Sequence, residues 1–192
     1  MSAVVISGDT SGSVTLQAPA VSGSTTQNLV AASGTLAPLI SGTVVNTTSG
    51  TSIDISTSIP SWVKRITVIY NGVSLSGSSH TVIQLGSGSY TTSGYTSTGA
   101  YAGTANSAGV ASATNGFVAH GGSNTNALTG TMTIALVGSN LWVASHSGML
   151  NTTIGTMGAG SVTLSGTLDR IRITSVNGTD TFDAGSVNIM YE

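Results

Sequence analysis

Short runs of alternating apolar and polar residues constrain this chain more than any other feature of its sequence. In one run Ile66, Val68 and Tyr70 occupy every second position, and a second run begins with Met132 and Ile134. A period of two is typical of a half-buried strand, and no stretch shows the 3.6-residue period of an amphipathic helix. Because residues that favour turns separate the runs, the sequence predicts an all-β fold, an antiparallel β-sandwich of jelly-roll-like type.

Three turn signals organise the predicted strands. The pair Asn71-Gly72 predicts a tight turn, residues 138–140 predict a hairpin, and Asn177-Gly178 predicts a turn between the last two strands. The final strand, around Val187 and Ile189, ends at the terminus of the chain. We expect it to lie inside a sheet, because an apolar strand at a free edge promotes aggregation.

The chain carries very little charge. Only 5% of its 192 residues are charged, the net charge is -2 and 39% are hydrophobic, with a mean hydropathy of +0.32. Ser- and Gly-rich chains can be flexible linkers, but disorder usually accompanies low hydrophobicity and high net charge. Weak self-repulsion lets identical copies pack closely, which favours a subunit of a large assembly.

Composition also excludes several classes of function. Four basic residues are too few for a phosphate-binding stripe, so nucleic acid is not an expected partner. The absence of cysteine excludes disulfides, thiolate metal sites and Cys nucleophiles. The first residues lack the basic region of a signal peptide, and no window is apolar enough to span a membrane, so no membrane insertion is expected.

The sequence divides into two parts. Residues 1–45 contain no aromatic residue and one charge, and short apolar pieces alternate there with Ser-Gly turns. Such a segment cannot bury a core alone, so we predict an extended attachment or oligomerisation segment, against the alternative of a flexible leader. Residues 46–192 carry the aromatic residues and nearly all the charges, and they are predicted to form the β-sandwich domain.

The stretch between Gly86 and Gly130 has the weakest strand signals, and we expect long loops with one or two strands in them. Its large polar-tipped side chains are Tyr90, Tyr95, Tyr101 and His120. Tyrosines among Ser and Gly resemble a paratope, since their rings give rigid contact area and their hydroxyls form hydrogen bonds. These four residues are the candidate binding site for a host surface; the alternative is that the tyrosines pack back on the sheet.

Catalytic and metal sites are not expected. His80, His120 and His146 all lie in Ser/Gly-rich surroundings, and the Gly-x-Ser-x-Gly motif of a nucleophile elbow is missing, so the chain is not predicted to be an enzyme. Asp180 and Asp183 could hold Ca²⁺, but without a third nearby carboxylate they favour a turn in which each caps the backbone. We therefore predict no cofactor and no metal.

Two further expectations concern the residues before the first long strand. Trp62 follows Pro60 and precedes an alternating strand, so it is predicted to be a core residue. Lys64 and Arg65 are expected to pair with Asp169 or Asp183, because so few charges are available. Such pairs, if exposed, contribute only about 0–1 kcal/mol each.

Three strings of residues resemble a known family. Residues 51–56 (TSIDIS), followed by residues 59–68 (IPSWVKRITV), are similar to a domain recurrent in tail-fibre and other structural proteins of bacteriophages. Residues 171–174 (IRIT) and 177–192 (NGTDTFDAGSVNIMYE) are similar to the end of that domain, and residues 6–16 (ISGDTSGSVTL) resemble the leader that often precedes it. The resemblance covers both ends of the chain and leaves out the middle.

The resemblance implies a structural protein of the virion that is assembled in the host cytoplasm, is usually homotrimeric and has no catalytic residue. We therefore expect a fibre-type adhesin that contacts a host surface glycan or protein and joins other virion proteins through residues 1–45. Because 192 residues are few for a long tail fibre, the alternative is a head fibre or capsid decoration protein that stabilises the shell.

Overall fold

The computed structural model describes residues 3–7, 11, 13–17, 37–104, 108–119 and 121–192. The chain divides into two compact units, Met1–Leu36 and Ala37–Glu192. The described residues form strands, turns and irregular segments without any helix, so there is none that could cross a membrane.

The first unit contains a β-hairpin. Strands β1 (Ala3–Ser7) and β2 (Ser13–Gln17) pair antiparallel, with Ile6 opposite Val14. The side chains of Val5 and Ile6 are exposed. A hairpin of two strands is at best marginally stable in water, because it cannot enclose a core.

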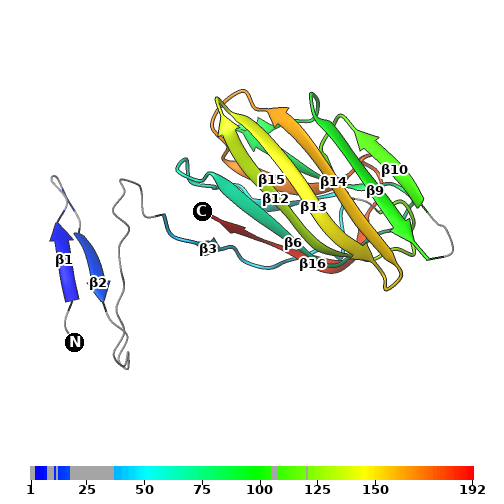
Figure 1. Ribbon diagram of the computed structural model, residues 1–192, viewed down its shortest axis with the longest axis horizontal. Coiled ribbons are helices and arrows are strands. Elements are labelled where there is room, and N and C mark those ends of the chain that lie inside the picture. The colour runs from blue at the N-terminus through cyan, green and yellow to red at the C-terminus, as the bar shows by residue number, and fades with distance from the viewer. Residues whose placement is uncertain (1–2, 8–10, 12, 18–36, 105–107, 120) are drawn as a thin grey trace. The chain divides into compact units, whose positions relative to one another are not determined.

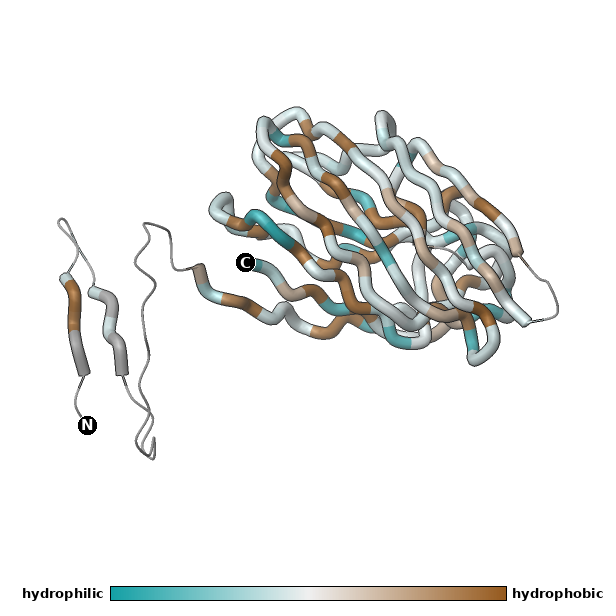
Figure 2. The backbone as a smooth tube through the Cα atoms, in the orientation of Figure 1, coloured by the Kyte–Doolittle hydropathy of each residue, from teal (hydrophilic) through white to brown (hydrophobic). Residues whose placement is uncertain are grey.

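The second unit is a β-sandwich of two antiparallel sheets, as the alternation predicts (Figure 1). The nine-stranded sheet has the order β10-β9-β14-β13-β12-β6-β16-β3, and β4 also pairs with β16. The five-stranded sheet has the order β11-β7-β15-β5, and β8 also pairs with β7. Figure 2 shows apolar and polar residues alternating along the strands of this unit.

The strands of the nine-stranded sheet are β3 (Ile40–Ser41), β4 (Val45–Asn46), β6 (Arg65–Leu75), β9 (Thr96–Gly103), β10 (Ala108–Ala113), β12 (Leu128–Gly138), β13 (Leu141–Leu150), β14 (Ile154–Thr163) and β16 (Phe182–Tyr191). Those of the five-stranded sheet are β5 (Ser52–Ser56), β7 (Thr81–Ser87), β8 (Ser89–Tyr90), β11 (Phe117–Ala119) and β15 (Arg170–Ser175).

The main core draws on both sheets. Ile66 and Ile134 of the large sheet and Ile83 and Ile173 of the small sheet are fully buried members of one apolar cluster. Alternate residues of long strands such as β6 and β12 enter this cluster, which gives the period of two seen in the sequence. Two sheets that share such a core form a rigid scaffold for the loops and strand ends around them.

The predicted hairpin at residues 138–140 is confirmed. Strands β12 and β13 pair antiparallel, and the connecting residues Ser139 and Asn140 have φ values of 47° and 61°. Positive φ at both central positions is typical of the type I′ turn, whose twist matches that of the paired strands.

The prediction of a turn at Asn71-Gly72 is wrong. Strand β6 runs through both residues, and Gly72 has a φ of +64° within it. The residues from Tyr70 to Val73 lie opposite a span one residue shorter in β12, so β6 carries an extra residue here. A register shift against β16 lies at the same place. The Asn-Gly pair therefore forms a β-bulge, which meets the same need for positive φ without reversing the chain.

The predictions for the last strand are confirmed in part. Strand β16 lies inside a sheet, with β6 on one side and β3 and β4 on the other. It does not pair with β15, which belongs to the small sheet. The turn at Asn177-Gly178 therefore connects the two sheets and is not a hairpin.

The long loops expected between Gly86 and Gly130 are mostly strands. Strands β8, β9, β10 and β11 lie in this stretch. In β9 and β10 the alternating positions hold Ser, Thr, Ala and Gly, so the hydrophobic contrast between the two faces is small. This explains why periodicity does not reveal them.

The boundary between the two units falls after Leu36 and not after residue 45. Strands β3 and β4 complete the edge of the large sheet by pairing with β16. Thr47 is fully buried, and its Oγ1 donates a hydrogen bond of 2.7 Å to the carbonyl oxygen of Ala184. Residues 37–47 are therefore part of the sandwich.

The prediction that Trp62 is a core residue is also wrong. Its side chain is 39% exposed, and its ring centroid lies 6.0 Å from that of Tyr191. The neighbouring Val63 is buried in its place, and Trp142 of β13 is the buried tryptophan. Trp62 lies in the segment before β6, where no strand pleat determines which side chain points inward.

Candidate functional site

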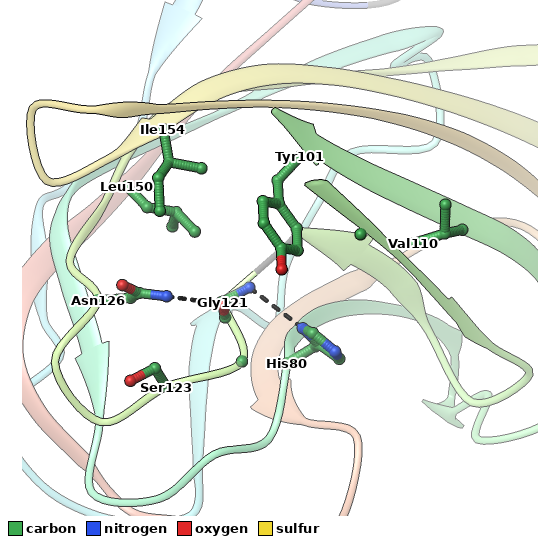
Figure 3. Close-up of a pocket in the computed structure, with 10 residues that line it drawn as sticks. His80, Tyr101, Val110, Gly121, Ser123, Asn126, Leu150 and Ile154 are labelled. Carbon is green, nitrogen blue, oxygen red and sulfur yellow. Dashed lines mark hydrogen bonds between the residues drawn. The ribbon is translucent and has the colours of Figure 1, made fainter. Parts of the chain in front are cut away.

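A pocket of about 370 Å³ lies where β9 and β10 meet residues 121–126 and the β13–β14 turn (Figure 3). We call it the Tyr101 pocket. Its lining residues are His80, Tyr101, Gly109, Val110, Gly121, Gly122, Ser123, Asn126, Leu150 and Ile154. Long loops and strand ends supply most of them, the usual location for a binding site on a sandwich.

The pairing of β9 with β10 positions Tyr101. Gly109 lies directly opposite Tyr101 in the register of these strands. A Cβ atom at residue 109 would lie 2.4 Å from Cε1 of the Tyr101 ring, much closer than atoms can approach. The ring therefore covers the glycine, and its side chain is half-exposed at the pocket. Cross-strand packing of an aromatic ring on glycine fixes the ring direction.

The polar side of the pocket is organised around the backbone of Gly121. The N–H of Gly121 donates to Nδ1 of His80 at 3.4 Å, and Nδ2 of Asn126 donates to its carbonyl oxygen at 3.0 Å. Figure 3 shows His80 and Asn126 on opposite sides of Gly121. Burial lowers the pKa of His80, so its imidazole is neutral at pH 7. With Nδ1 accepting, the proton of the neutral ring resides on Nε2.

The other side of the pocket is apolar. Leu150 and Ile154 lie at the β13–β14 turn on one side of Tyr101, and Val110 of β10, which is 76% exposed, lies on the other side of the ring (Figure 3). The described residues that line the pocket include no Asp, Glu, Lys or Arg. An aromatic ring, aliphatic side chains and neutral hydrogen-bonding groups suit a neutral ligand with both hydroxyl groups and apolar faces.

Tyr95 does not belong to a surface site. Its side chain is 2% exposed, its hydroxyl accepts a 2.8 Å hydrogen bond from the N–H of Leu85, and its ring packs edge-on against Phe117 at 5.0 Å between centroids. The prediction that Tyr95 is a binding residue is therefore wrong, and the alternative that it packs back on the sheet is correct.

Tyr90 lies apart from Tyr101. It is in β8 of the small sheet, and Cζ of Arg172 lies 4.2 Å from its ring centroid. Burial, together with the neighbouring Asp54, raises the pKa of Tyr90. The three tyrosines are therefore far from forming one site: Tyr101 lines a pocket, Tyr95 is in the core, and Tyr90 is on the small sheet. His120 lies outside the described residues.

The turn interpretation is confirmed for Asp180 and is wrong for Asp183, which lies in strand β16 and does not cap the backbone of a described residue. Asp180 accepts hydrogen bonds from Nδ2 of Asn177 at 2.7 Å and from the N–H of Ser79 at 2.9 Å, which lower its pKa. Asp183 instead accepts from the hydroxyl of Ser74. Across the described ranges no three His, Cys, Asp or Glu side chains gather as metal ligands would.

His146 is a buried polar residue that sequence reasoning did not single out as structural. It is 7% exposed, and Gly99 and Gly158 leave space for its ring, since a Cβ at residue 158 would lie 2.4 Å from Cε1 of His146. Within the described part of the chain, Nε2 of His146 has no hydrogen-bond partner. Burial lowers its pKa to about 4.

Most residues of the Tyr101 pocket were missed from the sequence. Leu150 and Ile154 are residue types common in any strand, and Ser123 and Asn126 are residue types common in any turn, so the sequence does not mark them as site residues. The pairing of β9 with β14 places Ile154 opposite Gly103, near Tyr101 and far from it in the sequence. Comparison of the chain with models of protein families, with curated proteins and with solved structures found no match.

Proposed function

We propose that this protein is a non-catalytic adhesin of a bacteriophage particle and binds a host-surface glycan in the Tyr101 pocket. The observation that carries the proposal is the ring of Tyr101, half-exposed over Gly109 beside the neutral polar groups of His80 and Asn126. Aromatic rings stack on the apolar faces of sugars, and amide and imidazole groups hydrogen-bond to sugar hydroxyls.

The assignment to a virion rests on the sequence. The strings at residues 51–56, 59–68, 171–174 and 177–192 resemble a domain of bacteriophage fibre proteins, and that resemblance implies a homotrimer joined to other virion proteins by its N-terminal part. The hairpin of β1 and β2 supports such a role, because exposed Val5 and Ile6 gain stability when another surface covers them.

A second candidate function is capsid decoration, and one observation favours it. Residues 66–168 contain no Asp, Glu, Lys or Arg, and they supply most of the large sheet. On the side of that sheet away from the core, Val110, Met157 and Met149 are 76%, 65% and 46% exposed. A broad uncharged face can pack against a protein shell without desolvating charges.

Two substitutions in whole particles separate the candidates. Tyr101→Ala removes the ring from the pocket, whereas Met157→Ser changes the uncharged face of the sheet. Adhesion predicts that Tyr101→Ala lowers adsorption to host cells while Met157→Ser does not, with capsids of normal heat resistance in both. Normal adsorption of Tyr101→Ala particles, combined with heat-fragile capsids in Met157→Ser, would favour decoration instead.

A further inference from the structure

A second pocket, of about 290 Å³, lies on the small sheet and contains Arg172, which forms no ion pair with a carboxylate of another described residue. Its lining includes Gln84 of β7, Arg172 and Thr174 of β15, and Thr92 and Asn115 from the segments beside β7. The described residues include two ion pairs, Arg65–Glu192 and Arg170–Asp169, and Arg172 takes part in neither.

Hydrogen bonds hold the guanidinium of Arg172 in one orientation. Its Nε donates to Oε1 of Gln84 at 2.7 Å, and Nε2 of the buried Gln84 donates to the carbonyl oxygen of Asn115 at 2.6 Å. Nδ2 of Asn115 in turn donates to the carbonyl oxygen of Val176 at 2.9 Å. Tyr90 covers one face of the guanidinium, with Cζ 4.2 Å from the ring centroid. The group is therefore already ordered before any ligand binds.

The fixed orientation leaves binding capacity at the other edge of the guanidinium. Only its Nε–H is used in a hydrogen bond with another described residue, so the Nη atoms keep their donors. Two parallel Nη–H groups match the two oxygens of a carboxylate. Around them, the pocket is lined by hydroxyls and amides, among them Thr92, Thr174 and Asn115.

The charge balance selects a monoanion. Among the described residues that line this pocket Arg172 is the one charged residue, and Asp54 lies opposite it on the neighbouring strand β5. Asp54 repels a phosphate, which carries close to two negative charges at neutral pH, more strongly than it repels a ligand carboxylate, whose single charge one guanidinium can balance.

We propose that this pocket is a second binding site, in which Arg172 recognises the carboxylate of an acidic sugar such as a uronic acid. The surrounding hydroxyl and amide groups bind the sugar hydroxyls. The inference rests on the proposed function only in taking the ligand to be a glycan, since the residues and the sheet differ from those of the Tyr101 pocket.

Titration of the full chain with glucuronate, followed by ¹H–¹⁵N NMR, tests the proposal. Glucuronate should shift the Nε–H signal of Arg172, the side-chain amide of Gln84 and the backbone signals of Thr92 and Thr174. Glucose and inorganic phosphate should leave these signals unchanged, and acetate should bind at least several-fold more weakly than glucuronate. No shift, equal binding of acetate, or tighter binding of phosphate would overturn the proposal.

Three variants sharpen the test. Arg172→Gln should weaken glucuronate binding by about tenfold or more, because a charge-assisted bidentate contact is lost. Arg172→Lys keeps the charge without the planar fork and should weaken it by a smaller factor. Arg170→Gln is the matched control, since Arg170 lies two residues away in β15 and pairs with Asp169, and it should bind normally. Equal binding by Arg172→Gln and the unmodified chain would contradict the assignment.

The outcomes also separate this site from the proposed function. If glucuronate binds at Arg172 but Tyr101→Ala leaves host attachment unchanged, the acidic-sugar site stands and the Tyr101 pocket fails. If glucuronate does not bind while Tyr101→Ala abolishes attachment, the Tyr101 pocket stands and the acidic-sugar site fails.

Discussion

The ring of Tyr101 occupies the space into which a side chain at residue 109 would project. A Cβ there would lie 2.4 Å from Cε1 and 3.0 Å from the hydroxyl oxygen of Tyr101. Because Gly109 and Tyr101 are directly opposed in β10 and β9, neither strand can shift to relieve the contact without breaking its register.

Gly109→Ala should therefore displace the Tyr101 ring and weaken binding of a host glycan by roughly threefold to tenfold, the loss expected from one aromatic contact. Isothermal titration with host polysaccharide fragments measures this. Gly155→Ala is the control, because its Cβ would meet only Ala102 O at 3.9 Å. Equal weakening by both variants would mean that the ring over Gly109 is not what the ligand recognises.

The two tryptophans should differ strongly in their contributions to stability. Trp142→Ala should lower the free energy of unfolding by about 3–5 kcal/mol, the usual range for a buried aromatic residue. Trp62→Ala should lower it by about 1 kcal/mol or less, because the side chain is 39% exposed and its ring lies tilted against that of Tyr191 at the surface. Urea unfolding of both variants decides the matter, and a loss at Trp62 as large as that at Trp142 would contradict the structure.

His146 should make the fold sensitive to mild acid. Burial lowers its pKa from 6.5 to about 4, so the unfolded chain binds a proton at a pH where the folded chain does not. The free energy of unfolding should consequently fall as the pH drops from about 6.5 to about 4, by up to about 3 kcal/mol, with no contribution from this residue above that range.

Urea unfolding between pH 4.5 and pH 8 measures the slope, and His146→Asn should flatten it. Some slope should remain from His80, whose pKa burial also lowers. Asp169 and Asp180 have lowered pKa values and titrate below the measured range. A slope that is the same in His146→Asn and the unmodified chain would show that His146 is not the responsible group.

Two truncations test where the sandwich begins. Removal of residues 1–36 should leave the unfolding midpoint nearly unchanged, because the cut falls between the two compact units. Removal of residues 1–47 should destabilise the domain, since it deletes β3, β4 and the hydrogen bond from Thr47 to Ala184.

Light scattering on the same proteins tests the oligomeric role of the first unit. We expect the full chain to be a trimer and the chain that begins at residue 37 to be a monomer. A full chain that stays monomeric at micromolar concentration would contradict the proposed homotrimer.

The fold class and the β12–β13 hairpin follow from the sequence because each depends on local signals. Met132 and Ile134 alternate with Thr131 and Thr133, and Ser139 and Asn140 adopt positive φ. Asn71-Gly72 carries the same local signal but lies within β6, where pairing with two neighbouring strands keeps the chain extended. A local signal for positive φ cannot distinguish a bulge from a turn, since both need it.

The candidate site could be predicted only in part, for a related reason. Tyr95 and Tyr101 have the same Ser, Thr and Gly surroundings in the sequence, yet Tyr95 is buried and Tyr101 is half-exposed. The two residues differ in their tertiary contacts. Phe117 packs on Tyr95, whereas Gly109 and the β13–β14 turn surround Tyr101. Neither relationship follows from the spacing of residues along the chain.

The central claim is that a host glycan binds at the ring of Tyr101. Its most direct test is titration of the purified full chain with host-surface polysaccharide fragments, comparing the unmodified protein with Tyr101→Ala and with Met157→Ala, an exposed control on the same sheet. The account predicts that binding is lost in Tyr101→Ala and retained in Met157→Ala, with both variants as stable as the unmodified protein. Equal affinity of Tyr101→Ala and the unmodified chain would contradict it.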